Sequence, residues 1–174
     1  MPGVVFLTSV TIEVPLFLAV QTGLRPLGIL SQALRRRDSG ALARSIELTL
    51  ESPDRMLLRG DPEALHSIVG NLVDNALRYI PLGNRVQVEI TVPGICRTLR
   101  VADDGPGVRA EERKRIFDRY YRIAASGMSG SGLGLAIVKQ AVNRMHGSIR
   151  VTEGLHGKGC SFIVELPAAA FRSQ

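Results

Sequence analysis

Apolar and polar residues alternate along several short segments of the chain, which is the pattern of strands buried on one face. The alternation predicts strands at residues 46–51, 86–92, 95–102, 148–153 and 161–166. Pro93 and Gly94 separate the second strand from the third, so these two are expected to form an antiparallel hairpin. The last two strands predict a second hairpin around a glycine-rich loop. A short apolar run at residues 56–58 is a candidate partner for the first strand.

Apolar residues three or four positions apart predict helices between these strands. One helix is expected to begin with Asp61 at its cap and Pro62 in its first turn, and to end near Tyr79. Its buried face is predicted to consist of Leu65, Ile68, Val69, Leu72, Val73 and Ala76. A second helix is expected over residues 135–145, with Gly147 as its C-terminal cap.

The first 45 residues have a different pattern. Residues 1–22 are mostly apolar, and the run at 4–20 is close to the minimum length that crosses a bilayer. Basic residues follow this run, as they do on the cytoplasmic flank of a membrane span. We interpret the run as a truncated span in contact with the membrane, with an interfacial anchor and a strand packed on the soluble domain as alternatives. Residues 23–45 predict an amphipathic linker helix, because leucines recur there at helical spacing.

Composition and charge narrow the class of protein. The 174 residues are 45% hydrophobic, which is enough for one domain with a buried core. The net charge of +6 is not gathered into a long basic stripe, so no nucleic-acid partner is expected. Residues 111–122 carry much of the charge and predict a short helical stretch. Cys96 and Cys160 match no metal-ligand spacing, so we interpret them as small apolar residues and expect no zinc site.

Three polar side chains share one side of the first predicted helix. Asn71 and Asn75 lie four residues apart, and Arg78 lies one turn further along. Asparagine is a mediocre helix former, so helix propensity does not account for two asparagines at this spacing. They are either surface polarity by chance or a pair of neutral oxygen ligands for a metal–phosphate group.

Two glycine-rich stretches carry further candidate chemistry. Residues 130–134, with sequence GSGLG, lead directly into the second helix, where free N–H groups and the helix dipole favour a phosphate. No Lys-Ser/Thr pair follows them and no strand precedes them, which excludes a Walker A loop and a dinucleotide-binding loop. Asp103 ends the third strand beside Gly105 and Gly107, so its carboxylate can accept a hydrogen bond from an amine while backbone approaches a flat ring.

Taken in order, these segments resemble the catalytic and ATP-binding domain of sensor histidine kinases, within the GHKL superfamily. The matching segments are NLVDNALRYIP (71–81), DDGPGV (103–108), IFDRYYR (116–122), GSGLGLAIV (130–138) and GKGCSFIVELP (157–167). They look like the N, G1, F, G2 and final glycine boxes of that family. The resemblance implies an α+β fold: a two-layer α/β sandwich with a mixed, mostly antiparallel sheet, helices on one face and a mobile ATP lid. The domain is expected at residues 46–168, followed by a tail at 169–174.

The resemblance also implies a role for each matching residue. Asn75 would hold the Mg²⁺ that bridges the ATP phosphates, with Asn71 in support and Arg78 beside the phosphates. Tyr79 would lie against the nucleotide, and Asp103 would accept the adenine amino group. The residues that shape the adenine pocket or close on the phosphates would be Gly105, Gly107, Gly130, Gly132, Leu133 and Gly134. Residues 109–129 would form the lid. Catalysis in this family is mainly positioning and charge neutralisation, the roles implied for Asn71, Asn75 and Arg78.

No histidine in the chain fits the phosphoacceptor pattern of the family, H-E-x-R-x-P. We therefore expect a kinase that transfers the γ-phosphate of ATP to a histidine in the dimerisation domain of a separate kinase chain, which in turn serves a response regulator. Self-phosphorylation is not expected. The alternative is a nucleotide-binding regulatory module, or an inactive truncation product, that binds Mg-ATP without transfer. The expected location is the cytoplasmic face of the bacterial inner membrane if residues 4–20 insert, and otherwise the cytoplasm.

Overall fold

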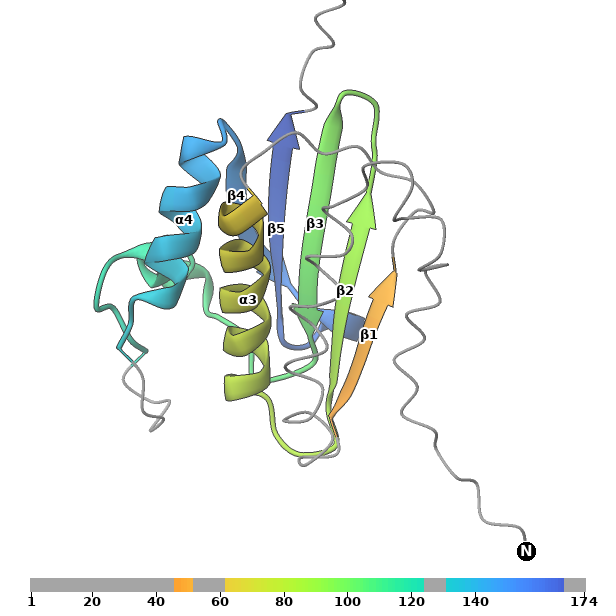
Figure 1. Ribbon diagram of the computed structural model, residues 1–174. Coiled ribbons are helices and arrows are strands. Elements are labelled where there is room, and N and C mark those ends of the chain that lie inside the picture. The colour runs from red at the N-terminus through yellow and green to blue at the C-terminus, as the bar shows by residue number, and fades with distance from the viewer. Residues whose placement is uncertain (1–45, 52–61, 124–130, 168–174) are drawn as a thin grey trace, which may run out of the picture.

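A five-stranded mixed sheet runs through the residues that the computed structural model describes, which are 46–51, 62–123 and 131–167 (Figure 1). Its strands are β1 (Glu47–Glu51), β2 (Arg85–Thr91), β3 (Cys96–Asp103), β4 (Ser148–Glu153) and β5 (Cys160–Pro167). Their order across the sheet is β1-β2-β3-β5-β4. β1 pairs with β2 in parallel, and every other pairing is antiparallel. Both predicted hairpins are therefore confirmed.

Two α-helices cover one face of this sheet, as Figure 1 shows. They are α3 (Pro62–Tyr79) and α4 (Gly134–Arg144), and they pack against each other as well as against the strands. The two-layer α+β architecture with helices on one face is confirmed. Parallel strands cannot be joined by a tight turn, and α3 lies in the crossover between β1 and β2. The stretch at 111–122 contains two short 3-10 segments, η1 (Ala110–Glu112) and η2 (Arg115–Phe117).

The core lies between the helices and the sheet. The face of α3 predicted to be buried is buried: Ile68, Val69, Leu72 and Val73 have no exposed surface, and Leu65 and Ala76 retain at most 5%. Alternate strand residues meet this face, among them Val86, Val88, Val101 and Val164. Fully burying one such side chain contributes about 1.5–3 kcal/mol, so the α3 face and the sheet together hold the two layers. Phe162 closes the core near η2, where its ring meets the Phe117 ring edge-on at 6.3 Å between centroids.

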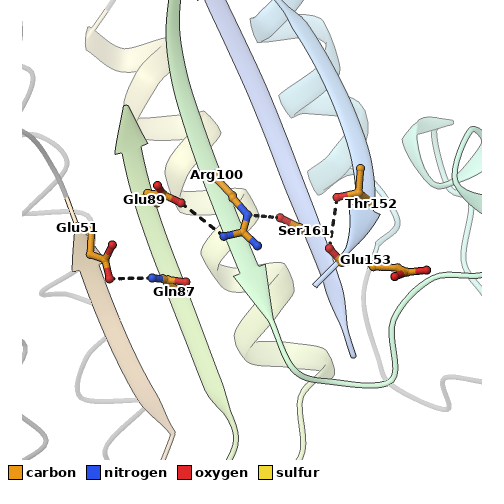
Figure 2. A network of polar contacts seen from close by, with 7 residues as sticks. All are labelled: Glu51, Gln87, Glu89, Arg100, Thr152, Glu153 and Ser161. Atoms are coloured by element: carbon orange, nitrogen blue, oxygen red, sulfur yellow. Dashed lines mark hydrogen bonds and ion pairs between the residues drawn. The ribbon is translucent and has the colours of Figure 1, made fainter. Parts of the chain in front are cut away.

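The opposite face of the sheet is polar. Figure 2 shows Arg100 between two neighbours there: its Nε donates to the hydroxyl of Ser161 at 2.8 Å, and its Nη1 approaches the carboxylate of Glu89 at 3.4 Å. Gln87 donates to Glu51 at 2.8 Å on the same face. Polar and apolar side chains alternate along β2 and β3, as the sequence pattern predicts, so the apolar face of the sheet is the one that the helices cover.

The C-terminal end of α4 differs from the expectation that Gly147 caps it. The residue in the left-handed conformation is His146, with φ of 55°. The N–H of His146 donates to the carbonyl of Asn143, and the N–H of Gly147 donates to the carbonyl of Val142, each at 3.0 Å. This is the Schellman arrangement with histidine in the place where glycine is common. Gly147 is required for another reason, because a Cβ there would lie 2.5 Å from the carbonyl oxygen of Glu165 on β5.

Several predictions fall outside the described residues. They are the apolar segment at 1–22 with its run at 4–20, the linker helix at 23–45, the short strand at 56–58, the cap Asp61, and the tail at 169–174. Within the described ranges no helix combines the length and the apolar character that crossing a bilayer requires. The boundaries of the domain stay a prediction.

Candidate functional site

A cavity of about 480 Å³ opens between α3, the first turn of α4, and the ends of β3 and β5. This volume lies within the range of small-molecule sites. The predicted site residues that line it are Asn71, Asn75, Arg78, Tyr79, Asp103, Gly107, Gly132, Leu133 and Gly134. They come from three segments that are far apart in the sequence, so the fold brings these residues together. Gly105 supports this cavity without lining it, and Gly130 lies outside the described residues.

One wall of the cavity is the polar edge of α3. Asn71 and Asn75 face the cavity together, one turn apart, and Arg78 and Tyr79 continue the same edge. The side-chain amide of Asn71 is oriented by its own helix, because Nδ2 donates to the carbonyl of Ser67 at 2.8 Å. Its Oδ1 is thereby turned toward α4, where a Cβ on Gly134 would lie 3.1 Å from it. The amide oxygen of Asn71 is therefore held against the N-terminus of α4.

The N-terminus of α4 forms the facing wall. Its first N–H groups have no partner within the helix, and the flanking residue Leu133 supplies no capping side chain. Gly132, Leu133 and Gly134 all border the cavity, so these donors and the positive end of the helix dipole are directed at it. A helix end of this kind binds phosphate. Asn71 and Asn75 line the same cavity, and neutral amide oxygens beside phosphates are a ligand set that fits Mg²⁺.

Asp103, at the end of β3, also lines the cavity and is only 4% exposed. Its Oδ1 accepts the N–H of Gly105 at 2.9 Å and the N–H of Cys160 at 3.2 Å. Its Oδ2 accepts the thiol of Cys160 at 3.1 Å. Burial raises the pKa of Asp103 above its ordinary value, although the hydrogen bonds from Cys160 and Gly105 oppose that rise. A perturbed pKa of a carboxyl group that lines a cavity is typical of functional carboxylates.

The glycines beside Asp103 are there because backbone segments approach closely. A Cβ on Gly107, whose φ is 74°, would lie 2.7 Å from the carbonyl oxygen of Gly159. A Cβ on Gly159 would in turn lie 2.5 Å from Oδ1 of Asp103. Neither contact leaves room for a side chain. The loop before β5 therefore packs directly on the end of β3, and this contact presents the carboxylate of Asp103 to the cavity.

Tyr121, in the segment that follows η2, also borders the cavity. Its hydroxyl donates to Oε1 of Glu112 at 3.2 Å, and the guanidinium of Arg115 lies 4.5 Å from the centre of its ring. Cation–π contacts of this length hold an aromatic ring in place. Burial and the hydrogen bond to Glu112 raise the pKa of Tyr121, so the phenol keeps its proton and remains a donor.

Some lining residues were not among the predicted site residues. They are Asp74, Pro106, Val108, Ile116, Tyr121, Arg122, Ile123, Ser131, Leu135, Ile137, Cys160 and Phe162. Tyr121 and Arg122 belong to IFDRYYR and Cys160 to GKGCSFIVELP, so the resembling segments contained a signal for them. The interpretation of Cys160 as a plain small apolar residue is incomplete, because its thiol is bonded to the central carboxylate of the cavity.

Comparison with known proteins agrees with this geometry. The sequence model of one protein family, the histidine kinase-, DNA gyrase B-, and HSP90-like ATPases, matches residues 60–170. The swarming motility regulation sensor protein RssA of Serratia marcescens is 43% identical over 130 residues, which are 73% of this chain and 27% of RssA. The sensor protein kinase PmrB of Pseudomonas aeruginosa is 44% identical over 140 residues, 80% of this chain and 28% of PmrB. The structure of the mycobacterial sensor histidine kinase MprB superposes with a TM-score of 0.73 at 33% identity, covering 81% of this chain and 94% of that one.

The fold and the family match define the class: the chain belongs to the histidine kinase-, DNA gyrase B-, and HSP90-like ATPases. Within that class the relatives are sensor kinases, and the domain described here is the catalytic, ATP-binding domain of a sensor histidine kinase. The chain spans little more than a quarter of the length of RssA and PmrB.

Proposed function

We propose that the chain binds MgATP in the cavity and transfers the γ-phosphoryl group to a histidine on a separate chain. The observation that carries the proposal is one cavity lined both by a buried carboxylate, Asp103, and by a helix N-terminus with two asparagines. The first suits the amino group of adenine, and the second suits phosphates with their metal. The structure of full-length ShkA, at 29% identity and a TM-score of 0.69, is in complex with the ATP analogue AMPPNP.

In this arrangement each residue has a defined task. Asp103 accepts a hydrogen bond from the 6-amino group of adenine, and Tyr79 lies against the nucleotide. The N–H groups at the start of α4 bind the phosphates, and Arg78 adds a positive charge at the same wall. Asn75 and Asn71 would hold Mg²⁺, which when bound neutralises charge on the phosphate oxygens. The chain thus contributes position and charge, which are the main sources of catalysis in phosphoryl transfer.

The nucleophile comes from elsewhere. The described histidines are His66, His146 and His156, and none of them is among the cavity-lining residues. The acceptor is therefore assigned to the dimerisation domain of another kinase chain. Its neutral imidazole nitrogen forms a bond to the γ-phosphorus with its lone pair, while the bond from that phosphorus to the β–γ bridging oxygen breaks. The electron pair of that bond leaves with ADP, and the imidazole proton passes to solvent. A response regulator would then take the phosphoryl group from the phosphohistidine.

A transfer assay tests this function. The chain is mixed with Mg²⁺, γ-radiolabelled ATP and the isolated dimerisation domain of a related sensor kinase, and label on that domain is measured. We expect label transfer that requires Mg²⁺ and is lost on Asn75→Ala. Asn143→Ala is the matched control, since Asn143 is an exposed asparagine of α4 that does not line the ATP cavity. Binding of MgATP without any transfer would favour the alternative, a regulatory nucleotide-binding module.

A further inference from the structure

The side chain of Tyr121, which lines the cavity, is held by residues that precede it in the chain. Its backbone N–H donates to the carbonyl of Asp118 at 3.3 Å. The guanidinium of Arg115 lies over the ring, 4.5 Å from its centre. The hydroxyl at the far end of the ring donates to Oε1 of Glu112 at 3.2 Å. The backbone, the face and the tip of this residue are therefore each fixed by a separate contact.

Glu112 can hold the hydroxyl because its own backbone is fixed. It is the last residue of η1, and its N–H donates to the carbonyl of Arg109 at 3.0 Å. The short segments η1 and η2 also contact each other, which places Glu112 beside the segment that carries Tyr121. Glu112 itself is not among the residues that line the cavity. Its effect on a ligand must therefore pass through Tyr121.

The second carboxylate oxygen of Glu112 lowers the stability of the folded chain. Oε2 is shielded from solvent, and it has no hydrogen-bond partner among the described residues. A carboxylate oxygen left without a donor in this way is unfavourable for folding. Residues that lower stability are commonly retained where function requires them. The contribution of Glu112 is therefore to be sought in the cavity.

A side chain that is already in position does not have to be ordered when a ligand binds. The contacts with Arg115 and Glu112 restrict the two torsions about which the Tyr121 ring turns. If the hydroxyl loses its acceptor, the ring regains part of this freedom, and binding must then restrict it. Ordering one side chain of this kind weakens a ligand's affinity by roughly fivefold.

We propose that Glu112 is a positioning residue for the nucleotide: by accepting the hydroxyl of Tyr121, it keeps the aromatic ring in place as a wall of the cavity before the nucleotide arrives. This inference rests on the proposed binding of MgATP in the cavity. Glu112 touches neither the nucleotide nor the transferred phosphoryl group. Its substitution should therefore weaken the affinity for MgATP and leave the rate of transfer at saturating MgATP unchanged.

Calorimetric titration of the 174-residue chain with MgATP tests the proposal. Glu112→Ala removes the acceptor, and Tyr121→Phe removes the donor but retains the ring. We expect each variant to bind MgATP roughly fivefold more weakly, which is the scale of one partly exposed hydrogen bond. The combined variant should bind no more weakly than either single variant, because the same bond is lost in all three.

Two further variants distinguish positioning from a general structural effect. Glu112→Gln retains an oxygen that can accept the hydroxyl, so its affinity for MgATP should stay within about twofold of the unsubstituted chain. Glu111→Ala is the matched control, since Glu111 is the exposed neighbouring glutamate of η1 and does not line the cavity. It should bind MgATP normally. Thermal unfolding of each variant confirms that it is folded before titration.

The ionisation of the Tyr121 phenol gives a spectroscopic readout of the bond itself. Burial and the bond to Glu112 raise the pKa of Tyr121, Arg115 lowers it, and the charges of Glu112 and Asp118 raise it further. The chain has three tyrosines, so an ultraviolet absorbance titration of Tyr121→Phe identifies which signal belongs to Tyr121. In Glu112→Ala this signal should move to lower pH, and in Glu111→Ala it should not move.

The outcomes separate this inference from the function on which it rests. Unchanged MgATP affinity in folded Glu112→Ala overturns the role of Glu112 and leaves the proposed function intact. Equal losses in Glu112→Gln and Glu112→Ala also overturn it, since an acceptor would then not matter. Additive losses in the combined variant contradict an action through Tyr121. Failure of the unsubstituted chain to bind MgATP would contradict the proposed function itself.

Discussion

A backbone hydrogen bond joins Tyr120 to Gly132, the glycine just before α4. The backbone N–H of Tyr120 donates to the carbonyl of Gly132 at 3.0 Å, and both residues have left-handed φ angles, of 63° and 69°. A Cβ on Gly132 would lie 2.8 Å from both the Cα and the carbonyl carbon of Tyr120. A tyrosine held in this conformation costs about 1–2 kcal/mol, so the surrounding contacts impose it. Gly132 is thereby fixed to the segment that follows η2.

Gly132→Ala should weaken MgATP binding by at least about tenfold, because the new methyl group separates Tyr120 from the loop that leads into α4. Gly94→Ala is the control. Gly94 also has a left-handed φ, of 56°, but nothing lies within 4 Å of the position of its Cβ. Both variants should lose about 1 kcal/mol of unfolding free energy from backbone strain, and Gly132→Ala should lose more because its methyl group also meets the backbone of Tyr120. Titration with MgATP distinguishes them, and equal affinities would contradict the importance of the contact between Tyr120 and Gly132.

Asp103→Asn should abolish most MgATP affinity without reducing the thermal unfolding temperature at neutral pH. The neutral amide lacks the ionised acceptor that binding requires, so affinity falls. The substitution also removes a negative charge whose burial is unfavourable, so stability does not fall. Substitution of a binding residue commonly raises the stability of the folded chain while function is lost. Asp104→Asn is the matched control, because the neighbouring carboxylate accepts the N–H of Arg85 at 2.8 Å and does not line the cavity. If both variants bind MgATP equally, Asp103 is not the base-recognition residue.

Acid should weaken MgATP binding at a higher pH than an ordinary aspartate would require. Burial raises the pKa of Asp103, so the carboxylate is protonated earlier as the pH falls and loses its free acceptor. Stability responds in the opposite direction. A carboxyl whose folded-state pKa is raised contributes stability below its unfolded pKa, and this contribution is lost as the pH rises through the folded value. As the pH is lowered across the acidic range, the unsubstituted chain should therefore lose MgATP affinity while protonation of Asp103 adds to its free energy of unfolding. Asp103→Asn should lack this contribution of Asp103 to the free energy of unfolding.

Ser161→Ala should cost about 0.5–1.5 kcal/mol of unfolding free energy and leave MgATP affinity unchanged. The substitution removes the 2.8 Å bond from Arg100 and leaves the guanidinium with its longer contact to Glu89 (Figure 2). Chemical denaturation measures the loss of stability. Arg100→Lys provides a comparison, since its single ammonium group cannot reproduce the geometry of the guanidinium. A change in nucleotide affinity would show that the polar face of the sheet communicates with the cavity.

Sequence periodicity and the resembling segments together predicted most of the fold and nine of the residues that line the cavity. The alternating strands and the apolar face of α3 followed from local pattern, and the four-residue spacing of Asn71 and Asn75 placed both on one side of a helix. The contacts that local pattern could not supply join residues distant in the chain. Cys160 meets Asp103 only because β5 pairs with β3 across 57 positions of sequence.

The end of α4 shows a second limit of sequence reasoning. A glycine after a helix predicts a left-handed cap, and Gly147 fits that rule. In the structure the preceding residue, His146, adopts that conformation, and Gly147 is needed for its closeness to β5. The reason for the glycine is tertiary packing, which sequence pattern does not contain.

The pairing of β3 with β5 links occupancy of the cavity to the integrity of the sheet. Asp103 ends one of these strands and Cys160 begins the other, so a nucleotide held between them cannot remain bound when the two strands separate. Ligand present at a hundred times its dissociation constant stabilises a folded chain by about 2.7 kcal/mol. Amide hydrogens of β5 beyond Phe162, in residues that do not line the cavity, should therefore exchange with solvent more slowly when MgATP is present.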